Sequence, residues 1–132
     1  LVMMLLGCDS EPMGPDEVYL SFVARSADGM SFDDELAYWS EDKVSQLEER
    51  LESIMKRSGR TRDEAIGLYM EISKRTAECT ALELLSKEVV RNTASVVFEA
   101  TDACGETTDS THNVQLVLEG EWKLNEVEIV IQ

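Results

Sequence analysis

The chain has 132 residues, which is enough for one domain and too few for two of ordinary size. Hydrophobic residues make up 43% of it, with only 7 glycines and 2 prolines, so the composition is that of a globular protein and excludes a disordered tail. The 27 acidic and 12 basic residues give a net charge of −15 at pH 7, which repels phosphate backbones and argues against nucleic acid as a partner.

The first six residues are apolar, and a polar stretch begins directly after Cys8. Six residues are too few to span a bilayer, which takes about 20, but they match the end of the apolar segment of a secretory signal peptide. Residues 5–8, Leu-Leu-Gly-Cys, resemble the bacterial lipobox. This resemblance implies cleavage before Cys8, a diacylglyceryl group on its sulfur and a further acyl chain on the new amino terminus, which together anchor a protein stably to a membrane. The alternative is an N-terminal strand that carries a buried cysteine.

The lipobox resemblance places the protein at the cell envelope, anchored to the membrane by lipid and facing the periplasm or the cell surface. The charged residues that begin a signal peptide are expected upstream of residue 1. Asp9 resembles the residue that retains enterobacterial lipoproteins in the inner membrane. We therefore expect residues 1–14 to comprise the end of a signal peptide, the lipobox and a short tether, and residues 15–132 to form a single domain.

Amphipathic patterns predict that most of the next 60 or so residues are helical. Pro15 suits the first position of a helix that ends at residues 28–29, Asp-Gly. A short second helix is expected to begin near Ser31 and to direct Leu36 and Trp39 inward.

Two longer helices follow. The third is expected from about Ser40 to Ser58, because its apolar residues form one stripe and Gly59 stops it. Thr61 and Glu64 form a capping box that begins the fourth. The expected buried face of that helix consists of Ala65, Leu68, Tyr69 and Ile72.

From Ala77 onward, alternation replaces the helical period and predicts strands near residues 79–90, 93–104, 112–118 and 121–131. The sharpest turn signal is Glu119-Gly120, before the last strand. A bulge near Asn125 would bring five apolar residues of that strand to one face: Trp122, Leu124, Val127, Ile129 and Ile131. Helices first and an antiparallel meander afterwards predict an α+β fold.

The remaining cysteines, Cys79 and Cys104, form an even pair in an oxidising compartment if Cys8 carries lipid. A two-residue turn at Arg91-Asn92 would pair the flanking strands so that the two cysteines lie directly opposite, at a non-hydrogen-bonded position. Such positions have Cα separations of about 4.5–5.5 Å, within reach of a disulfide. We predict a Cys79–Cys104 disulfide; the alternative is two buried free thiols.

The order of these elements, together with residues 85–98 and 117–124, resembles bacterial lipoproteins with a domain like nuclear transport factor two, the cone-shaped fold shared with ketosteroid isomerase. Residues 120–124, Gly-Glu-Trp-Lys-Leu, match the Gly-x-Trp-Lys-apolar pattern that begins the last strand in those proteins. The resemblance covers roughly residues 15–131. It implies helices packed on a curved four-stranded sheet with a conical pocket between them, but the superfamily hosts isomerases, dehydratases and many non-enzymes, so the fold leaves function open.

No catalytic set of that superfamily maps onto this chain, so the catalytic residues stay unknown. His112, the one histidine, follows a polar stretch and is expected to be solvent-exposed at a strand start. Asp102, Glu106 and Asp109 match no calcium-loop spacing, and the two cysteines lack the paired short spacings of zinc sites. We therefore predict no metal and no cofactor.

Five residues are candidates for the pocket. Tyr38, Trp39 and Tyr69 could line its mouth, although aromatic residues on helix faces are commonly core. Glu83 and Asp102 share strand parity with expected core residues such as Leu85 and Phe98, although charged residues of mixed parity are common near strand ends. Both interpretations of these five residues remain open from the sequence.

The function expected from these observations is that of a membrane-anchored envelope lipoprotein whose domain binds a small apolar ligand or acts as an adaptor for another envelope protein. One alternative is a ketosteroid-isomerase-like or dehydratase-like enzyme that uses a pocket acid or base. Another is a structural envelope component with an exposed apolar sheet face. The sequence names neither the ligand nor the partner, and it leaves the oligomeric state open.

Overall fold

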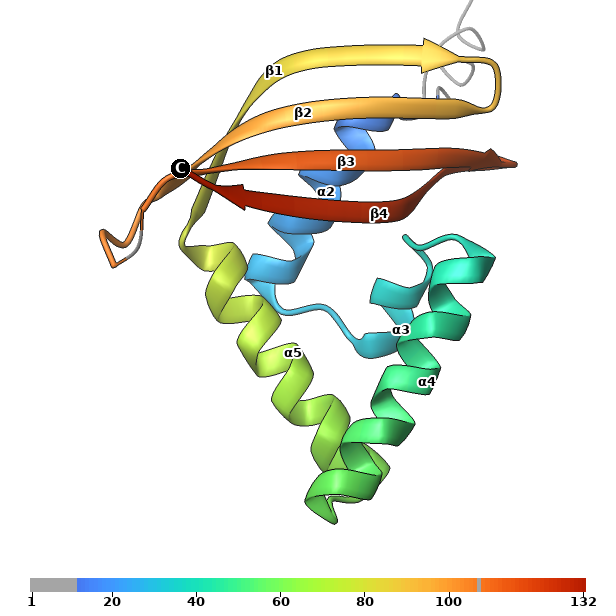
Figure 1. The fold of residues 1–132 in the computed structure, drawn as a ribbon, viewed down its shortest axis with the longest axis vertical. Helices are drawn as coiled ribbons and strands as arrows, with labels where there is room; N and C mark the ends of the chain where they lie inside the picture. The colour runs from blue at the N-terminus through green and yellow to red at the C-terminus, as the bar shows by residue number, and fades with distance from the viewer. Residues whose placement is uncertain (1–11, 107) are drawn as a thin grey trace, which may run out of the picture.

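The computed structural model describes residues 12–106 and 108–132, and within them four helices precede a four-stranded antiparallel sheet (Figure 1). The predicted α+β fold is confirmed, while Cys8 and the lipobox lie outside the described residues. The helices are α2 Pro15–Asp28, α3 Phe32–Leu36, α4 Glu41–Ser58 and α5 Arg62–Glu78, and the strands are β1 Thr80–Val90, β2 Thr93–Asp102, β3 Ser110–Glu119 and β4 Glu121–Ile131. The strands pair in the order β1-β2-β3-β4.

The ends of the helices follow the capping signals in the sequence. α2 begins at Pro15, and the chain leaves it at Gly29 in a left-handed conformation (φ 91°) that favours glycine. The hydroxyl of Ser40 caps the start of α4. The predicted capping box of α5 is confirmed: the Thr61 hydroxyl accepts from the Glu64 N–H at 3.2 Å, and the Glu64 carboxylate accepts from the Thr61 N–H at 2.9 Å.

The helices cover the sheet unevenly. α2 crosses its inner face, whereas α4 and α5 extend away from it and meet at their far ends (Figure 1). α5 packs mainly against α2 and α4, so much of its length is away from the sheet. Ala65 is buried as expected, but Leu68 and Ile72 are exposed, and the prediction that they face the core was wrong. None of the described helices has the length and apolar content to cross a membrane.

The hydrophobic core lies between α2 and the inner face of the sheet. Phe98, Leu116 and Leu124 are its largest fully buried apolar side chains, and they come from β2, β3 and β4. Tyr19 of α2 packs on Phe98 with ring centroids 5.3 Å apart. Trp39 is buried beside this core, as the sequence predicted, and forms a parallel bridge to β4.

The last strand contains the predicted bulge. Gln115 pairs with Glu126 and Leu116 pairs with Leu124, which leaves Asn125 as the extra residue. The bulge changes the parity of β4 at this point. The apolar residues on both sides of it therefore share the inner face of the sheet: Trp122, Leu124, Val127, Ile129 and Ile131.

A second bulge, which the sequence did not reveal, lies in β1. The hairpin turns at Arg91-Asn92 as predicted, and its register follows the prediction up to Ser86. Leu84 then pairs with Phe98, so Leu85 is the extra residue. Leu85 is 56% exposed, and its assignment to the core was wrong because the bulge reverses the parity of the rest of β1.

Candidate functional site

A cavity of about 350 Å³ opens between the last turns of α5 and the ends of the strands. Its walls come from the end of α5, from the start of β1, from β2, β3 and β4, and from the β2–β3 turn. The lining residues are Ile72, Arg75, Thr76, Cys79, Thr80, Ala100, Thr101, Asp102, Glu106, Thr108, Ser110, His112, Ile129 and Ile131. Figure 1 shows the last turn of α5 meeting the sheet at the end where the chain terminates.

Three isoleucines form the apolar part of this cavity and are open to solvent. Ile72 is 58% exposed, Ile129 is 52% exposed and Ile131 is 67% exposed. Both residues of β4 lie on the inner face of the sheet, where apolar side chains are normally covered by a helix. Only the last turns of α5 approach the sheet here and the rest of the helix points away from it, so these side chains stay uncovered.

His112 lies in the wall of the cavity. The prediction that its side chain is exposed to solvent was wrong. His112 is only 7% exposed, because β3 begins at Ser110 and both residues face inward. Its Nδ1 lies 2.8 Å from the hydroxyl oxygen of Tyr19 on α2. Burial lowers the pKa of His112 and raises the pKa of Tyr19. The pair therefore stays neutral at neutral pH.

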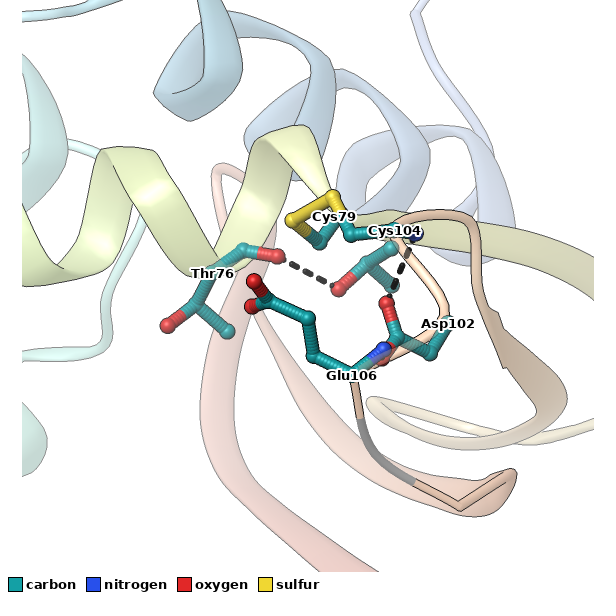
Figure 2. The surroundings of a disulfide bond; sticks show 6 residues. Thr76, Cys79, Asp102, Cys104 and Glu106 are labelled. Carbon is teal, nitrogen blue, oxygen red and sulfur yellow. Dashed lines mark hydrogen bonds between the residues drawn. A yellow bond between two sulfur atoms is a disulfide. The ribbon is translucent and has the colours of Figure 1, made fainter.

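The predicted disulfide between Cys79 and Cys104 is present at the edge of the cavity, with the two Cα atoms 5.1 Å apart (Figure 2). The strand register from which we predicted the disulfide was wrong. The bulge in β1 shifts the register by one, so the cysteines are not directly opposite each other. Cys79 instead ends α5, Cys104 lies in the turn after β2, and the Ala103 N–H donates to the Cys79 carbonyl oxygen at 2.7 Å.

The turn that carries Cys104 is organised by Asp102. One oxygen of its carboxylate accepts a hydrogen bond from the Cys104 N–H at 2.8 Å, and the other accepts from the Glu106 N–H at 2.6 Å. Both bonds are local side-chain-to-backbone contacts of the kind that fix acidic turns. With Arg75 of α5, the carboxylates of Asp102 and Glu106 supply the charged part of the cavity wall.

The five pocket candidates from the sequence are not brought together. Only Asp102 lines the cavity that contains His112. Tyr38 hydrogen bonds to Ser21 in the helical layer, and Trp39 borders a separate hollow at the start of α4. Tyr69 lines a cavity of about 30 Å³ between the helices. Glu83 is exposed on the outer face of β1, because the bulge reverses its parity.

A buried carboxyl group was missed altogether. Glu35 of α3 is fully buried, and the hydroxyl of Tyr69 on α5 donates a hydrogen bond to its Oε2. The other oxygen, Oε1, is buried, and so is Nε1 of Trp39. Burial raises the pKa of Glu35, and the polar groups of Tyr69 and Trp39 partly oppose that rise. In the sequence Glu35 ends a run of three acidic residues, which is typical of a solvated helix face.

Glu35→Gln should make the stability of the protein less dependent on pH. Because the folded state raises the pKa of Glu35, this residue favours folding at low pH, and that contribution is lost as the pH rises from the ordinary value near 4.5 through the folded value. The amide keeps the volume and removes the ionisation, so the variant should be more stable than the wild type above this window. Urea unfolding between pH 4 and pH 8 measures the difference. Asp33→Asn, an exposed acid on the same helix, is the control, and equal profiles for wild type and Glu35→Gln would contradict the expectation.

Comparisons with protein-family models, with curated proteins and with solved structures returned no match for this chain.

Proposed function

We propose that this chain is a lipid-anchored envelope lipoprotein whose domain binds a small, mainly apolar ligand in the cavity beside His112, without catalysis. The observation that carries the proposal is the apolar wall formed by Ile72, Ile129 and Ile131, which stays exposed around a concave site. Ligand sites are typically concave, largely apolar and supplied with a few polar groups, and this cavity has that composition.

His112 is the polar group best placed to orient such a ligand. Its Nδ1 is engaged by Tyr19, and its ring belongs to the cavity wall. When the Tyr19 hydroxyl donates to Nδ1, the proton of the neutral imidazole is on Nε2. In this tautomer Nε2–H is a hydrogen-bond donor, and the matching ligand carries an oxygen acceptor next to its apolar body.

The anchor and the location in the envelope rest on the lipobox resemblance of residues 5–8, which implies acylation of Cys8. The Cys79–Cys104 disulfide supports the same compartment, because disulfides persist mainly outside the reducing cytoplasm. A lipid anchor on Cys8 followed by a tether of six residues would hold the domain, from Pro15 onward, close to the membrane surface.

Ile131→Asp should weaken binding of the dye anilinonaphthalene sulfonate to the folded protein by at least roughly tenfold. A fully buried isoleucine side chain contributes about 1.5–3 kcal/mol, and about 1.4 kcal/mol corresponds to a tenfold change in affinity. Fluorescence titration measures the dissociation constant. Val90→Asp is the matched control, because Val90 is 56% exposed at the end of β1 and away from the cavity. Equal losses in both variants, or no binding by the wild type, would contradict the proposal.

The enzyme alternative is favoured by one specific observation. It requires an acid or base in the pocket, and His112 lies in the cavity wall with a pKa lowered by burial. In the other neutral tautomer, Nδ1–H donates to the Tyr19 hydroxyl oxygen and Nε2 is free to accept a proton from a substrate. His112→Gln separates the two functions. If the domain only binds a ligand, wild type and variant turn over no substrate, and the variant keeps the part of the dye affinity that apolar contacts provide. If the domain is an enzyme, the variant loses the turnover that the wild type shows and still binds.

A further inference from the structure

We propose that reduction of the Cys79–Cys104 disulfide converts this corner of the domain into a site for one divalent cation of the zinc class, bound by both thiolates and the carboxylate of Asp102. The inference does not depend on the proposed ligand. It rests on one cluster: the sulfur atoms of the two cysteines and a carboxylate oxygen of Asp102 all lie within 4.8 Å of one another. The sequence spacing predicted no metal site, because Asp102 and Cys104 reach Cys79 only through the fold.

The backbone around the cluster holds these residues together without help from the sulfur–sulfur bond. The Ala103 N–H donates to the Cys79 carbonyl oxygen at 2.7 Å, and Thr80 pairs with Asp102 as the first residue pair of the sheet. The Thr80 hydroxyl also donates to the Thr76 carbonyl oxygen at 2.7 Å, which fixes the junction between α5 and β1. Reduction therefore frees the two thiols while the segments that carry them stay in place.

The carboxylate is oriented in advance. Its two oxygens accept hydrogen bonds from the Cys104 and Glu106 N–H groups, which fixes the carboxylate in the turn (Figure 2). In this position one of its oxygens lies within 4.8 Å of both sulfur atoms. Metal-binding carboxylates are commonly held by such hydrogen bonds, and these outer contacts raise affinity. Glu106 lines the same cavity as Cys79 and Asp102. Its carboxylate, or a water molecule, can therefore supply the fourth ligand of the cation.

The chemistry favours a borderline-soft cation. Zinc binds thiolates at about 2.3 Å and carboxylate oxygens at about 2.0–2.2 Å, so ligand atoms within 4.8 Å need only small side-chain rotations once the sulfur atoms separate. A dithiol reductant gives two electrons and two protons to the disulfide and is itself oxidised to a disulfide. The cation then displaces both thiol protons into solvent. Cys104 is exposed, so a small dithiol can reach it.

The test is a titration of the whole chain with Co²⁺ as a spectroscopic probe. The protein is reduced with dithiothreitol, which is removed under anaerobic conditions, and circular dichroism confirms that each variant is folded. Reduced wild type should bind one equivalent of Co²⁺ with an intense thiolate-to-cobalt absorption band, while the oxidised protein and Cys79→Ser/Cys104→Ser should show no such band. Asp102→Asn should weaken binding by at least about tenfold, and Asp42→Asn, at the start of α4, should leave it unchanged.

Three results would overturn the proposal. The first is a folded, reduced wild type without the thiolate band. The second is equal Co²⁺ binding by oxidised and reduced protein, which would place the cation on surface carboxylates. The third is unchanged affinity in reduced Asp102→Asn, which would remove Asp102 from the site. Because dye binding in the cavity is measured separately with oxidised protein, failure of the metal site and failure of the ligand site are distinguishable.

Discussion

Phe98→Ala is expected to lower the free energy of unfolding by about 3–5 kcal/mol. Phe98 is fully buried in β2, packs on Tyr19 with ring centroids 5.3 Å apart and pairs with His112 on the neighbouring strand β3. Truncation removes the transfer free energy of the ring and leaves a cavity that the strands cannot close. Urea unfolding followed by circular dichroism measures the change as a lower midpoint at an unchanged slope.

Val97→Ala is the control for this variant, because Val97 is the next residue on the outer face of the same strand and is only half-buried. It should cost clearly less than Phe98→Ala. Similar losses in the two variants would mean that the core does not lie on the side of the sheet that α2 covers.

Removal of the disulfide by Cys79→Ser/Cys104→Ser is expected to cost about 3 kcal/mol, because the bond joins residues 25 positions apart and restricts the unfolded chain. Small domains have total stabilities of about 5–15 kcal/mol, so the variant should still fold. Thermal unfolding of the variant and of chemically reduced wild type should give similar losses. A loss below about 1 kcal/mol in both would show that the disulfide contributes little to the stability of the domain.

Much of the fold could be predicted because its signals are local. The capping box at Thr61, the glycine after α2 and the turn at Arg91-Asn92 each depend on residues a few positions apart. The bulge at Asn125 was also visible, since the apolar residues of β4 change parity there. The bulge at Leu85 was not, because apolar residues occupy both parities of β1 and give no sign of where the register changes.

The site could not be predicted in the same way, because burial there depends on distant segments. His112 appears as a lone polar residue after a polar loop, and it is buried because its position in β3 directs it inward, against Tyr19 of α2. Glu35 is hydrogen bonded by Tyr69 of α5, 34 positions further along the chain, and no local pattern links the two residues. The apolar wall likewise joins Ile72 of α5 to the end of β4, and its exposure follows from the divergence of α5 from the sheet.

Native mass spectrometry of the protein, extracted gently from its own membrane, tests the central claim that the cavity holds a small ligand. We expect one discrete small-molecule adduct on a chain that carries the covalent mass of lipid at Cys8, and we expect Ile131→Asp to lose the adduct and to keep the lipid. A lipidated chain without an adduct, alone or in complex with another protein, would contradict ligand binding and favour an adaptor or structural role.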